Sequence, residues 1–333
     1  MTINSAHRVA MIVCDGIQAL DVTGPLEVFS CASQLLLESG RTASAGYEVC
    51  LAAHRRGPVR TSSDLALVAD FAWSGLGHVD TLLVSGPAKD EGAPECREFV
   101  AWLAENAPAA SRYGSVCAGA MLLARAGLLD KRRVATHRSL AGRLAEMAPT
   151  ARVATDALFV RDDRLWTSAG ATAGMDMALA MVEADWGRKL ALDVARQLLL
   201  HLKRSGSAAQ ISATLEAQSR AADGRFRDLA GWVLANPVET LSIDSLARQC
   251  GMSTRHFARC FRAEMGMTPA KFVESVRFEA ACQALATQEP VESIASRCGF
   301  GTSETLRRVF IRRTGVSPAA YRRRMERGLA HRE

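Results

Sequence analysis

Cys117 is the residue whose type and setting suggest covalent chemistry. It lies in Ser115-Val116-Cys117-Ala118-Gly119, between a predicted strand and a predicted helix and among small side chains. Such a nucleophile elbow exposes the reactive atom at a sharp turn, and the amino end of the following helix lowers the pKa of a thiol. A small buried cysteine without a chemical role gives the same pattern. The elbow therefore marks a candidate site and leaves both interpretations open.

Arginines towards the C-terminus form a second candidate site, one suited to DNA. Residues 225–333 carry 18 Lys and Arg against 11 Asp and Glu, whereas residues 1–190 carry 19 against 21. Seventeen of those 18 positive residues are arginine, whose guanidinium makes forked contacts with phosphate and guanine. The basic charge of the chain therefore belongs to its last third.

A repeated unit organises this last third. The residues Leu246-Ala247 and Cys250-Gly251 recur 48 positions later as Ile294-Ala295 and Cys298-Gly299. Each copy predicts a helix, a short turn with glycine and a second helix opening at a Ser or Thr cap, which is the helix-turn-helix pattern. A further helix follows each copy, because Thr268-Pro269 and Ser317-Pro318 place a capping hydroxyl before a proline at the first helical position.

Helix geometry, at about 100° per residue, separates a buried face from an exposed face on the second helix of each copy. Phe257 and Phe261 anchor the first of these helices, and Leu306 and Phe310 anchor the second. The opposite faces can present donors to guanine or an acceptor to cytosine. The residues that we expect to contact DNA are Arg255, His256, Arg259 and Arg262 in the first copy, and Ser303, Glu304, Thr305, Arg307 and Arg308 in the second. Arg307, Arg313 and the run Arg322 to Arg324 suit phosphate contacts, whereas a solvated, arginine-rich helix bundle is the alternative without function.

Length and composition favour a globular protein of about two domains. The chain has 333 residues, of which 48% are hydrophobic and 23% charged, and no uncharged apolar stretch reaches the 18 or so residues of a membrane helix. Nine cysteines lie scattered without a C-x-x-C pair or a Cys/His cluster at metal spacing, so we expect no metal and no cofactor. Because no signal-peptide pattern is present either, we expect a location in the reducing cytoplasm without membrane attachment.

The first part of the chain alternates short apolar runs with helical patterns. Predicted strands at Val9–Cys14, Tyr47–Ala53 and Thr81–Val84 alternate with predicted helices at Leu26–Leu37 and Glu95–Asn106. This alternation predicts an α/β domain, a flavodoxin-like sandwich whose parallel sheet is covered on both faces. We place this domain at residues 1–187, a helix and linker at residues 188–224, and an all-α domain with two helix-turn-helix motifs at residues 225–333.

The stretch from about Leu241 to Arg324 resembles the AraC/XylS family of bacterial transcription regulators. The resemblance rests on SIDSLARQCGMSTRHFARCFR, on IASRCGFGTSETLRRVF and on GVSPAAYR. It implies two helix-turn-helix units joined by a helix at Pro269 to Thr287, with both reading helices in adjacent major grooves on one face of double-stranded DNA.

The first domain resembles the ThiJ/PfpI branch of the class I glutamine-amidotransferase-like domains. The resemblance rests on the elbow and on four other segments, LDVTGPLEVF from Leu20, VSGP from Val84, TH at Thr136 and TSAG…GMD from Thr167. The order of the two domains is that of GlxA-type regulators. The resemblance therefore implies a sensing domain that also forms homodimers, with two copies on two half-sites.

Comparison with the catalytic relatives defines a candidate effector pocket. Their elbow cysteine is often followed by histidine, whereas Ala118 stands here, and Asp21 matches an acidic position of isocyanide-hydratase-like members. His137 is a possible base, although Arg138 follows it where regulators of the family usually carry Trp. We therefore expect a small polar metabolite to bind among Asp21, Gly86, Cys117, Ala118 and His137 without turnover.

Taken together, the sequence predicts a DNA-binding transcription regulator controlled by a small-molecule effector, and no enzyme. Two other classes stay open. One is a cysteine-dependent amidase or hydratase with an accessory DNA-binding domain, and the other is a nucleoid protein that binds all DNA sequences about equally.

Overall fold

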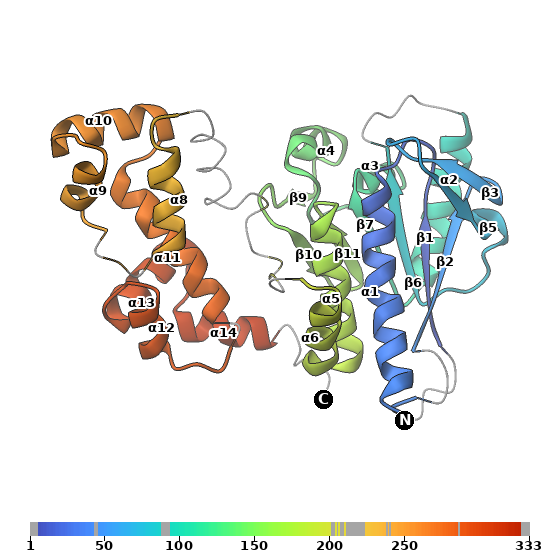
Figure 1. Ribbon diagram of the computed structural model, residues 1–333. Coiled ribbons are helices and arrows are strands. Elements are labelled where there is room, and N and C mark those ends of the chain that lie inside the picture. Colours follow the sequence, from blue (N-terminus) through green and yellow to red (C-terminus); the bar gives the residue numbers. More distant parts are fainter. Residues whose placement is uncertain are drawn as a thin grey trace. The chain divides into compact units, whose positions relative to one another are not determined.

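A computed structural model of the chain describes residues 6–42, 46–87, 94–200, 204, 206, 210, 224–237, 239, 241–285 and 287–327. For residues 94–96 and 324–327 it describes the backbone alone. The chain divides into two compact units, residues 1–210 and 211–333, which are described separately. Figure 1 shows the elements of both units.

The first unit is built on a seven-stranded sheet. Its strands are β1 (His7–Ile12), β2 (Tyr47–Ala53), β5 (Phe71–Ala72), β6 (Thr81–Gly86), β7 (Arg112–Cys117), β10 (Phe159–Asp162) and β11 (Leu165–Ser168). They lie in the order β10-β11-β7-β6-β1-β2-β5, and every pair is parallel except β10 with β11 at one edge. Two small sheets join β3 (Gly57–Arg60) to β4 (Ala66–Ala69) and β8 (Arg133–Val134) to β9 (Arg152–Val153).

Helices cover both faces of this sheet, which confirms the predicted α/β sandwich. They are α1 (Ala19–Glu38), α2 (Pro94–Asn106), α3 (Gly119–Arg125), α4 (Ala141–Met147), α5 (Thr172–Trp186) and α6 (Arg188–Gln197). Val9 and Met11 of β1 pack in a core with α1, α5 and α6, whereas Ala10 and Ile12 pack in a core with α2, α3 and α4. This alternation along one strand is what a strand buried on both faces requires.

Helix α1 begins earlier than the sequence predicts. We expect a start at Leu26, after Pro25, but the helix begins at Ala19 and contains that proline. The ring of Pro25 is buried where α1 meets α5, so close to Gly174 that a Cβ there would lie 3.0 Å from its Cγ. The packing of Pro25 between the two helices thus compensates for the backbone hydrogen bond that α1 loses at this proline. Because of this early start, Asp21 lies in the first turn of a helix and not in a loop.

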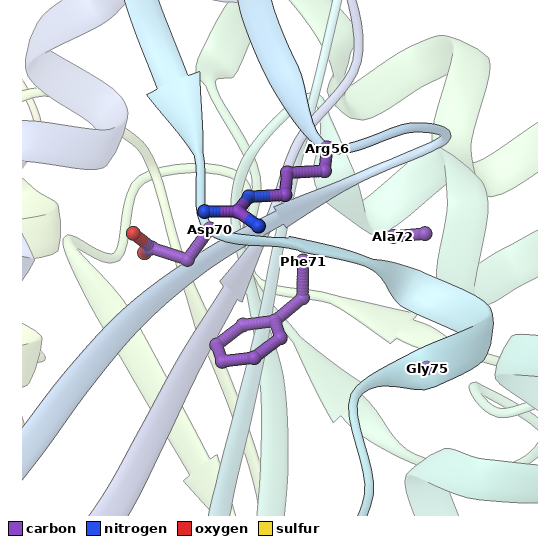
Figure 2. A pocket seen from close by; sticks show the side chains of 5 residues that line it. All are labelled: Arg56, Asp70, Phe71, Ala72 and Gly75. Carbon is purple, nitrogen blue, oxygen red and sulfur yellow. The ribbon is translucent and has the colours of Figure 1, made fainter.

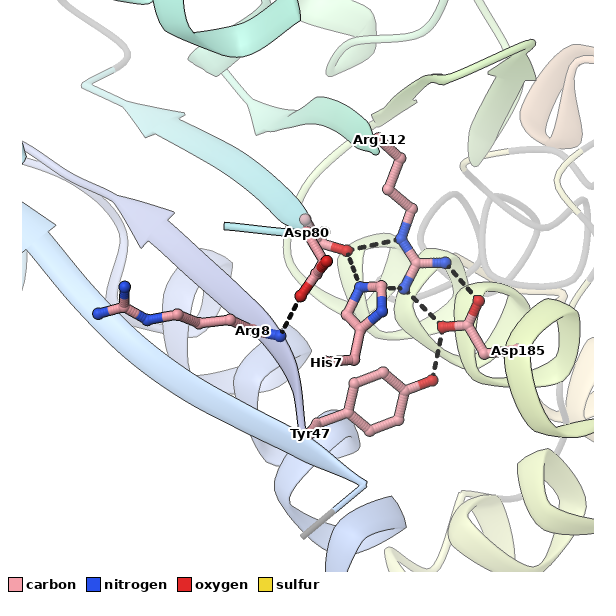
Figure 3. Close-up of polar contacts among 7 residues, drawn as sticks. His7, Arg8, Tyr47, Asp80, Arg112 and Asp185 are labelled. Atoms are coloured by element: carbon pink, nitrogen blue, oxygen red, sulfur yellow. Dashed lines mark hydrogen bonds and ion pairs between the residues drawn. The ribbon is translucent and has the colours of Figure 1, made fainter. Parts of the chain in front are cut away.

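A cluster of charged and polar side chains joins the amino ends of the strands (Figure 3). Arg112 at the start of β7 donates to both carboxylate oxygens of Asp185 on α5, at 2.8 and 2.7 Å, and its Nε donates to Thr81 Oγ1 at 2.7 Å. Tyr47 at the start of β2 donates its hydroxyl to Asp185 Oδ2 at 2.7 Å. The Arg112 side chain is only 10% exposed. One guanidinium therefore connects β6, β7 and α5 at the amino-terminal ends of the strands. Cys117 lies at the other end of β7.

His7 completes this cluster as a neutral ring. His7 Nε2 lies 2.7 Å from Thr81 Oγ1 and 3.4 Å from Arg112 Nη2, and because a guanidinium can only donate, Nε2 is the acceptor of the Arg112 contact. That nitrogen must carry a lone pair, which places the proton of the ring on Nδ1. Burial, and next to it the positive charge of Arg112, lower the pKa of His7 in agreement with this assignment.

The described residues of the second unit form helices only. These are α8 (Arg227–Ala235), α9 (Ile243–Gln249), α10 (Thr254–Met265), α11 (Pro269–Ala284), α12 (Val291–Arg297), α13 (Ser303–Thr314) and α14 (Pro318–Arg327). Phe257 and Phe261 centre one core, and Leu306 and Phe310 centre another. Helix α11 contributes Phe272 to the first core and Ala281 to the second, so it connects the two repeated units (Figure 1).

The Arg112 cluster predicts a local loss of stability. Replacing Arg112 by Met leaves Asp185 Oδ1 without its donor and removes the hydrogen bond to Thr81, so we expect the free energy of unfolding to fall by about 3 kcal/mol. Arg132→Met is the matched control, because its pair with Asp162 spans 3.6 Å with both side chains 30% exposed or more, and such a pair contributes below about 1 kcal/mol. Urea unfolding followed by tryptophan fluorescence measures both variants. Equal losses would contradict the structural role of the cluster.

Candidate functional site

Cys117 sits at a strained turn between β7 and α3. Its φ is +54°, a left-handed value that a side chain disfavours, and it is followed directly by Ala118 and the helix. Gly119 allows the close approach of this turn to β6, because a Cβ there would lie 2.0 Å from the Val84 carbonyl oxygen. The backbone thus has the geometry of the predicted elbow.

Three elements meet around the thiol. Asp21 of α1, 1% exposed, lies against Cys117, and its Oδ1 accepts a hydrogen bond from the Ala171 amide just before α5. Gly170, with φ +96°, closes the site from the β11 side. A Cβ on Gly170 would lie 2.5 Å from the Cys117 Cβ and 2.9 Å from Asp21 Oδ1, so only glycine leaves room for the pair.

The elbow does not activate this thiol. Burial, and next to it the charge of Asp21, raise the pKa of Cys117 to about 12, although the Ala118 amide favours the thiolate. Burial also raises the pKa of Asp21, against the stabilising effects of the Ala171 amide, the thiol and His137. The expectation of a lowered thiol pKa is therefore wrong, because desolvation and a neighbouring carboxyl outweigh the helix. The raised pKa favours the protonated thiol, which can donate a hydrogen bond to the Asp21 carboxyl.

The other predicted pocket residues divide between the site and its rim. Gly86 pairs with Cys117 across β6 and β7, and Ala118 is 2% exposed. His137 is exposed, and its Nδ1 lies 2.7 Å from Ser139 Oγ. Thr136 was not predicted as a site residue, yet its hydroxyl donates to the Cys117 carbonyl at 2.9 Å. Gly170 was also missed, although the TSAG segment contains it.

A separate surface pocket of about 430 Å³ lies on the β2 side of the sheet (Figure 2). It is lined by Arg56, Asp70, Phe71, Ala72 and Gly75. Asp70 is engaged there with the fold, because its Oδ2 accepts from the Leu51 amide at 2.8 Å. None of the predicted effector residues lines this pocket, so it is distinct from the thiol site.

The first helix-turn-helix unit comprises α9 and α10. Gly251, with φ +64°, makes the turn, and Ser253 caps α10 by accepting from the His256 amide. Phe257 and Phe261 are fully buried, while the four predicted DNA-contact residues of this helix are exposed, as the face analysis predicts. His256 Nδ1 lies 3.2 Å from Arg259 Nη2, so two of those residues contact each other on the outer face.

The second unit repeats this arrangement in α12 and α13. Gly299, with φ +77°, makes the turn, and Thr302 caps α13 by accepting from the Thr305 amide. Glu304, Arg307 and Arg308 are exposed, whereas Ser303 and Thr305 are half-buried. Arg307 Nη1 lies 3.4 Å from Glu304 Oε1 in an exposed pair.

Two arginines expected at phosphates have structural partners instead. Arg313 donates to Ser275 Oγ at 2.8 Å and pairs with Glu274 at 3.2 Å, both on α11. Arg322 donates to the carbonyls of Leu285 and Glu289. Both guanidiniums are bound within the unit, and the phosphate contacts expected of them stay predictions. Arg323 is exposed, and the side chain of Arg324 lies outside the described residues.

The described residues show neither a candidate metal site nor a membrane helix. Within them no group of three or more His, Cys, Asp or Glu side chains could hold a metal ion. No helix in the described part of the chain is long and apolar enough to cross a membrane.

Comparison with protein families gives two matches along the chain. A model of the DJ-1/PfpI family matches residues 7–184, and a model of a helix-turn-helix domain matches residues 246–324. The first match covers the Cys117 site, and the second covers both repeated units.

Individual relatives agree with this division. The HTH-type transcriptional regulator Rv1931c of Mycobacterium tuberculosis is 33% identical over 255 residues, 74% of this chain and 95% of the relative. GbdR, an HTH-type transcriptional regulator of Pseudomonas aeruginosa, is 26% identical over 94% of this chain and 83% of its own. An isonitrile hydratase of Pseudomonas putida is 27% identical over 54% of this chain and 72% of its own.

Among solved structures, the crystal structure of an AraC family transcriptional regulator from Pseudomonas putida has a TM-score of 0.50 and 24% identity. It covers 58% of this chain and 99% of its own, and it supports the fold alone. The chain therefore belongs to the DJ-1/PfpI family through its first unit and to the AraC-type helix-turn-helix regulators of transcription, which bind DNA, through its second.

Proposed function

We propose that this transcription regulator recognises a specific DNA sequence through α10 and α13 and that a small polar molecule bound beside Cys117 controls it. The protein acts in the cytoplasm, where the DNA is accessible to it. The observation that carries the DNA-binding part is the exposed arginine face on both capped helices, each opposite a fully buried aromatic or leucine core.

The distribution of free guanidiniums supports base reading. Arg255, Arg262 and Arg308 are exposed, and their guanidiniums make no hydrogen bond or ion pair with any residue that the structure describes. Side chains of this kind can reach guanine O6 and N7 without breaking an existing contact. Arg307 must break its exposed ion pair with Glu304 to bind DNA, at a cost of less than about 1 kcal/mol. The Glu304 carboxylate is then free to accept a hydrogen bond from cytosine N4.

The thiol site supports ligand binding and disfavours catalysis. The neutral thiol of Cys117 and the buried carboxyl of Asp21 offer a donor and an acceptor in a confined, polar place. A sensor must hold its ligand in one of two states, and turnover would remove that ligand. The names of the regulator relatives agree with a role in transcription, and a thiol with a pKa of about 12 is unsuited to the nucleophilic step of an amidase.

The DNA-binding proposal predicts two kinds of arginine variant. Arg259→Ala and Arg308→Ala should each weaken binding to the best site selected from a random library by about 1 to 3 kcal/mol and relax base preference. Arg323→Ala is the matched control, because the loss of a phosphate contact lowers affinity for all sequences alike. Fluorescence anisotropy with selected and scrambled duplexes measures both. Equal losses on the two duplexes for Arg259→Ala would refute base reading.

The effector proposal predicts ligand binding that depends on the Cys117 pair. In calorimetry with a panel of amino acids and quaternary amines, we expect at least one compound to bind the wild type and not a Cys117→Ala, Asp21→Ala double variant. Cys50→Ala, which changes a buried cysteine of β2 away from Asp21, should bind normally. The proposal fails if no compound binds or if binding survives the double substitution.

The homodimer carried by the family resemblance is tested separately. Multi-angle light scattering of the full chain at micromolar concentration should give twice the monomer mass of 35.8 kDa. Two copies would then bind two half-sites. A monomer under these conditions and also on DNA would contradict the dimer.

A further inference from the structure

The chain leaves the first unit beside the thiol site. After α6, the described residues Arg204, Gly206 and Gln210 lie against that unit, and the second unit begins at residue 211. We call these three residues the exit segment. Each of the three residues contacts a different part of the first unit. These contacts hold the end of the first unit, after which the chain continues to the DNA-binding unit.

Gln210 is bound by its side-chain amide as a ligand would be. Its Nε2 donates to the carbonyls of Thr136 at 2.9 Å and Ala157 at 3.0 Å, with Thr155 at 3.4 Å, while its Oε1 accepts from the Arg138 amide at 2.8 Å. The backbone carbonyls face the nitrogen of the side-chain amide, and a backbone N–H faces its oxygen. This arrangement matches both the donor and the acceptor of a primary carboxamide. A carboxylate in the same place would face three acceptors, and an alkyl group would remove the hydrogen bonds to all four backbone groups.

Thr136 connects this amide to the thiol turn. Its carbonyl accepts from Gln210, and its hydroxyl donates to the Cys117 carbonyl at 2.9 Å. Thr136 is 1% exposed, and both contacts are partly buried. A shift of the Cys117 backbone therefore acts on the bound carboxamide through one residue.

Arg204 makes the second attachment, on the Asp21 side of the site. It donates to the buried carboxylate of Asp176 from its backbone N at 2.9 Å and from its Nε at 2.8 Å, and its Nη2 reaches Thr172 Oγ1 at 2.7 Å. Thr172 begins α5, directly after the Ala171 amide that donates to Asp21.

Gly206 lies between these attachments against β10. Its carbonyl accepts from the Phe159 amide at 3.3 Å, and a Cβ on Gly206 would lie 2.5 Å from the Phe159 carbonyl oxygen. The exit segment thus touches the surroundings of both members of the Asp21–Cys117 pair.

We propose that Thr136, Arg138 and Ala157 form a carboxamide-binding site whose occupant is Gln210, and that this bound glutamine is a latch that holds the exit segment against the effector site. Primary carboxamides in solution compete for the same backbone groups. The regulatory consequence rests on the proposed function. A ligand bound beside Cys117 shifts Thr136, and this shift strengthens or weakens the hydrogen bonds of Gln210 and thereby changes the affinity of the protein for DNA.

Hydrogen exchange in the full-length protein tests the latch directly. In Gln210→Ala the Arg138 amide loses its acceptor, so its exchange should speed up about tenfold, and Gln210→Glu should do the same by repulsion from the carbonyls. Gln197→Ala, which removes an exposed amide at the end of α6, should leave it unchanged. Propionamide at about 10 mM, comparable with the effective concentration of a tethered group, should slow the exchange in Gln210→Ala again. Unchanged exchange at Arg138 in both Gln210 variants would overturn the latch, and an absence of rescue would overturn the carboxamide site.

DNA binding tests the consequence and separates it from the effector proposal. Gln210→Ala should change the Kd for the selected duplex at least about threefold, whereas Gln197→Ala should not. An unchanged Kd would refute the regulatory role of the latch. If a panel compound binds at Cys117 while Gln210→Ala leaves Arg138 protected, the latch is wrong and the effector site stands. If Arg138 is released but no compound binds, the latch stands and the effector proposal fails.

Discussion

The buried carboxyl of Asp21 is the constraint around which the first unit is arranged. A carboxyl that is 1% exposed needs partners, and it has them in the Ala171 amide and the Cys117 thiol. These partners come from β7 and from the turn before α5, and they can approach only because Gly170 lacks a side chain and Cys117 accepts a left-handed φ. The same contacts that satisfy Asp21 also suppress the thiolate. The effector role proposed for this site rests on that arrangement.

In the second unit, core packing decides which arginines remain available for DNA. Arg313 is bound to Glu274 and Ser275, and Arg277 donates to the carbonyls of Pro237 and Glu239 at 2.8 and 2.9 Å. These guanidiniums fix α11 between the two cores. Arg255 and Arg308 lie on the opposite faces of helices anchored by Phe257 and Leu306, and no described residue of the unit binds their guanidiniums. Net charge alone does not separate these two groups, because both kinds of arginine contribute to it equally.

The sequence predicts elements well where periodicity carries the information. Alternating strands and helices predict the parallel sheet, and the spacing of Phe257 and Phe261 predicts which side of α10 is buried. It fails where distant residues decide. The pKa of Cys117 depends on Asp21, which is far away in the chain, and the start of α1 depends on the fit of Pro25 against Gly174. The roles of Arg112 and Gln210 depend on partners that no local pattern indicates.

A latch made of neutral hydrogen bonds has the right strength for regulation. Each such bond contributes about 0.5 to 1.5 kcal/mol net, so the contacts of Gln210 together are worth a few kcal/mol at most. Coupling between two sites in allosteric proteins is typically about 1 to 3 kcal/mol. A charged side chain buried in place of Gln210 would bind its partner too strongly or be expelled, because desolvation of an ion costs several kcal/mol. A small ligand can offset the loss of a carboxamide contact only if it binds the two states with different affinity. The choice of glutamine at the exit of the first unit therefore keeps the two states close enough in free energy for a metabolite to move the balance.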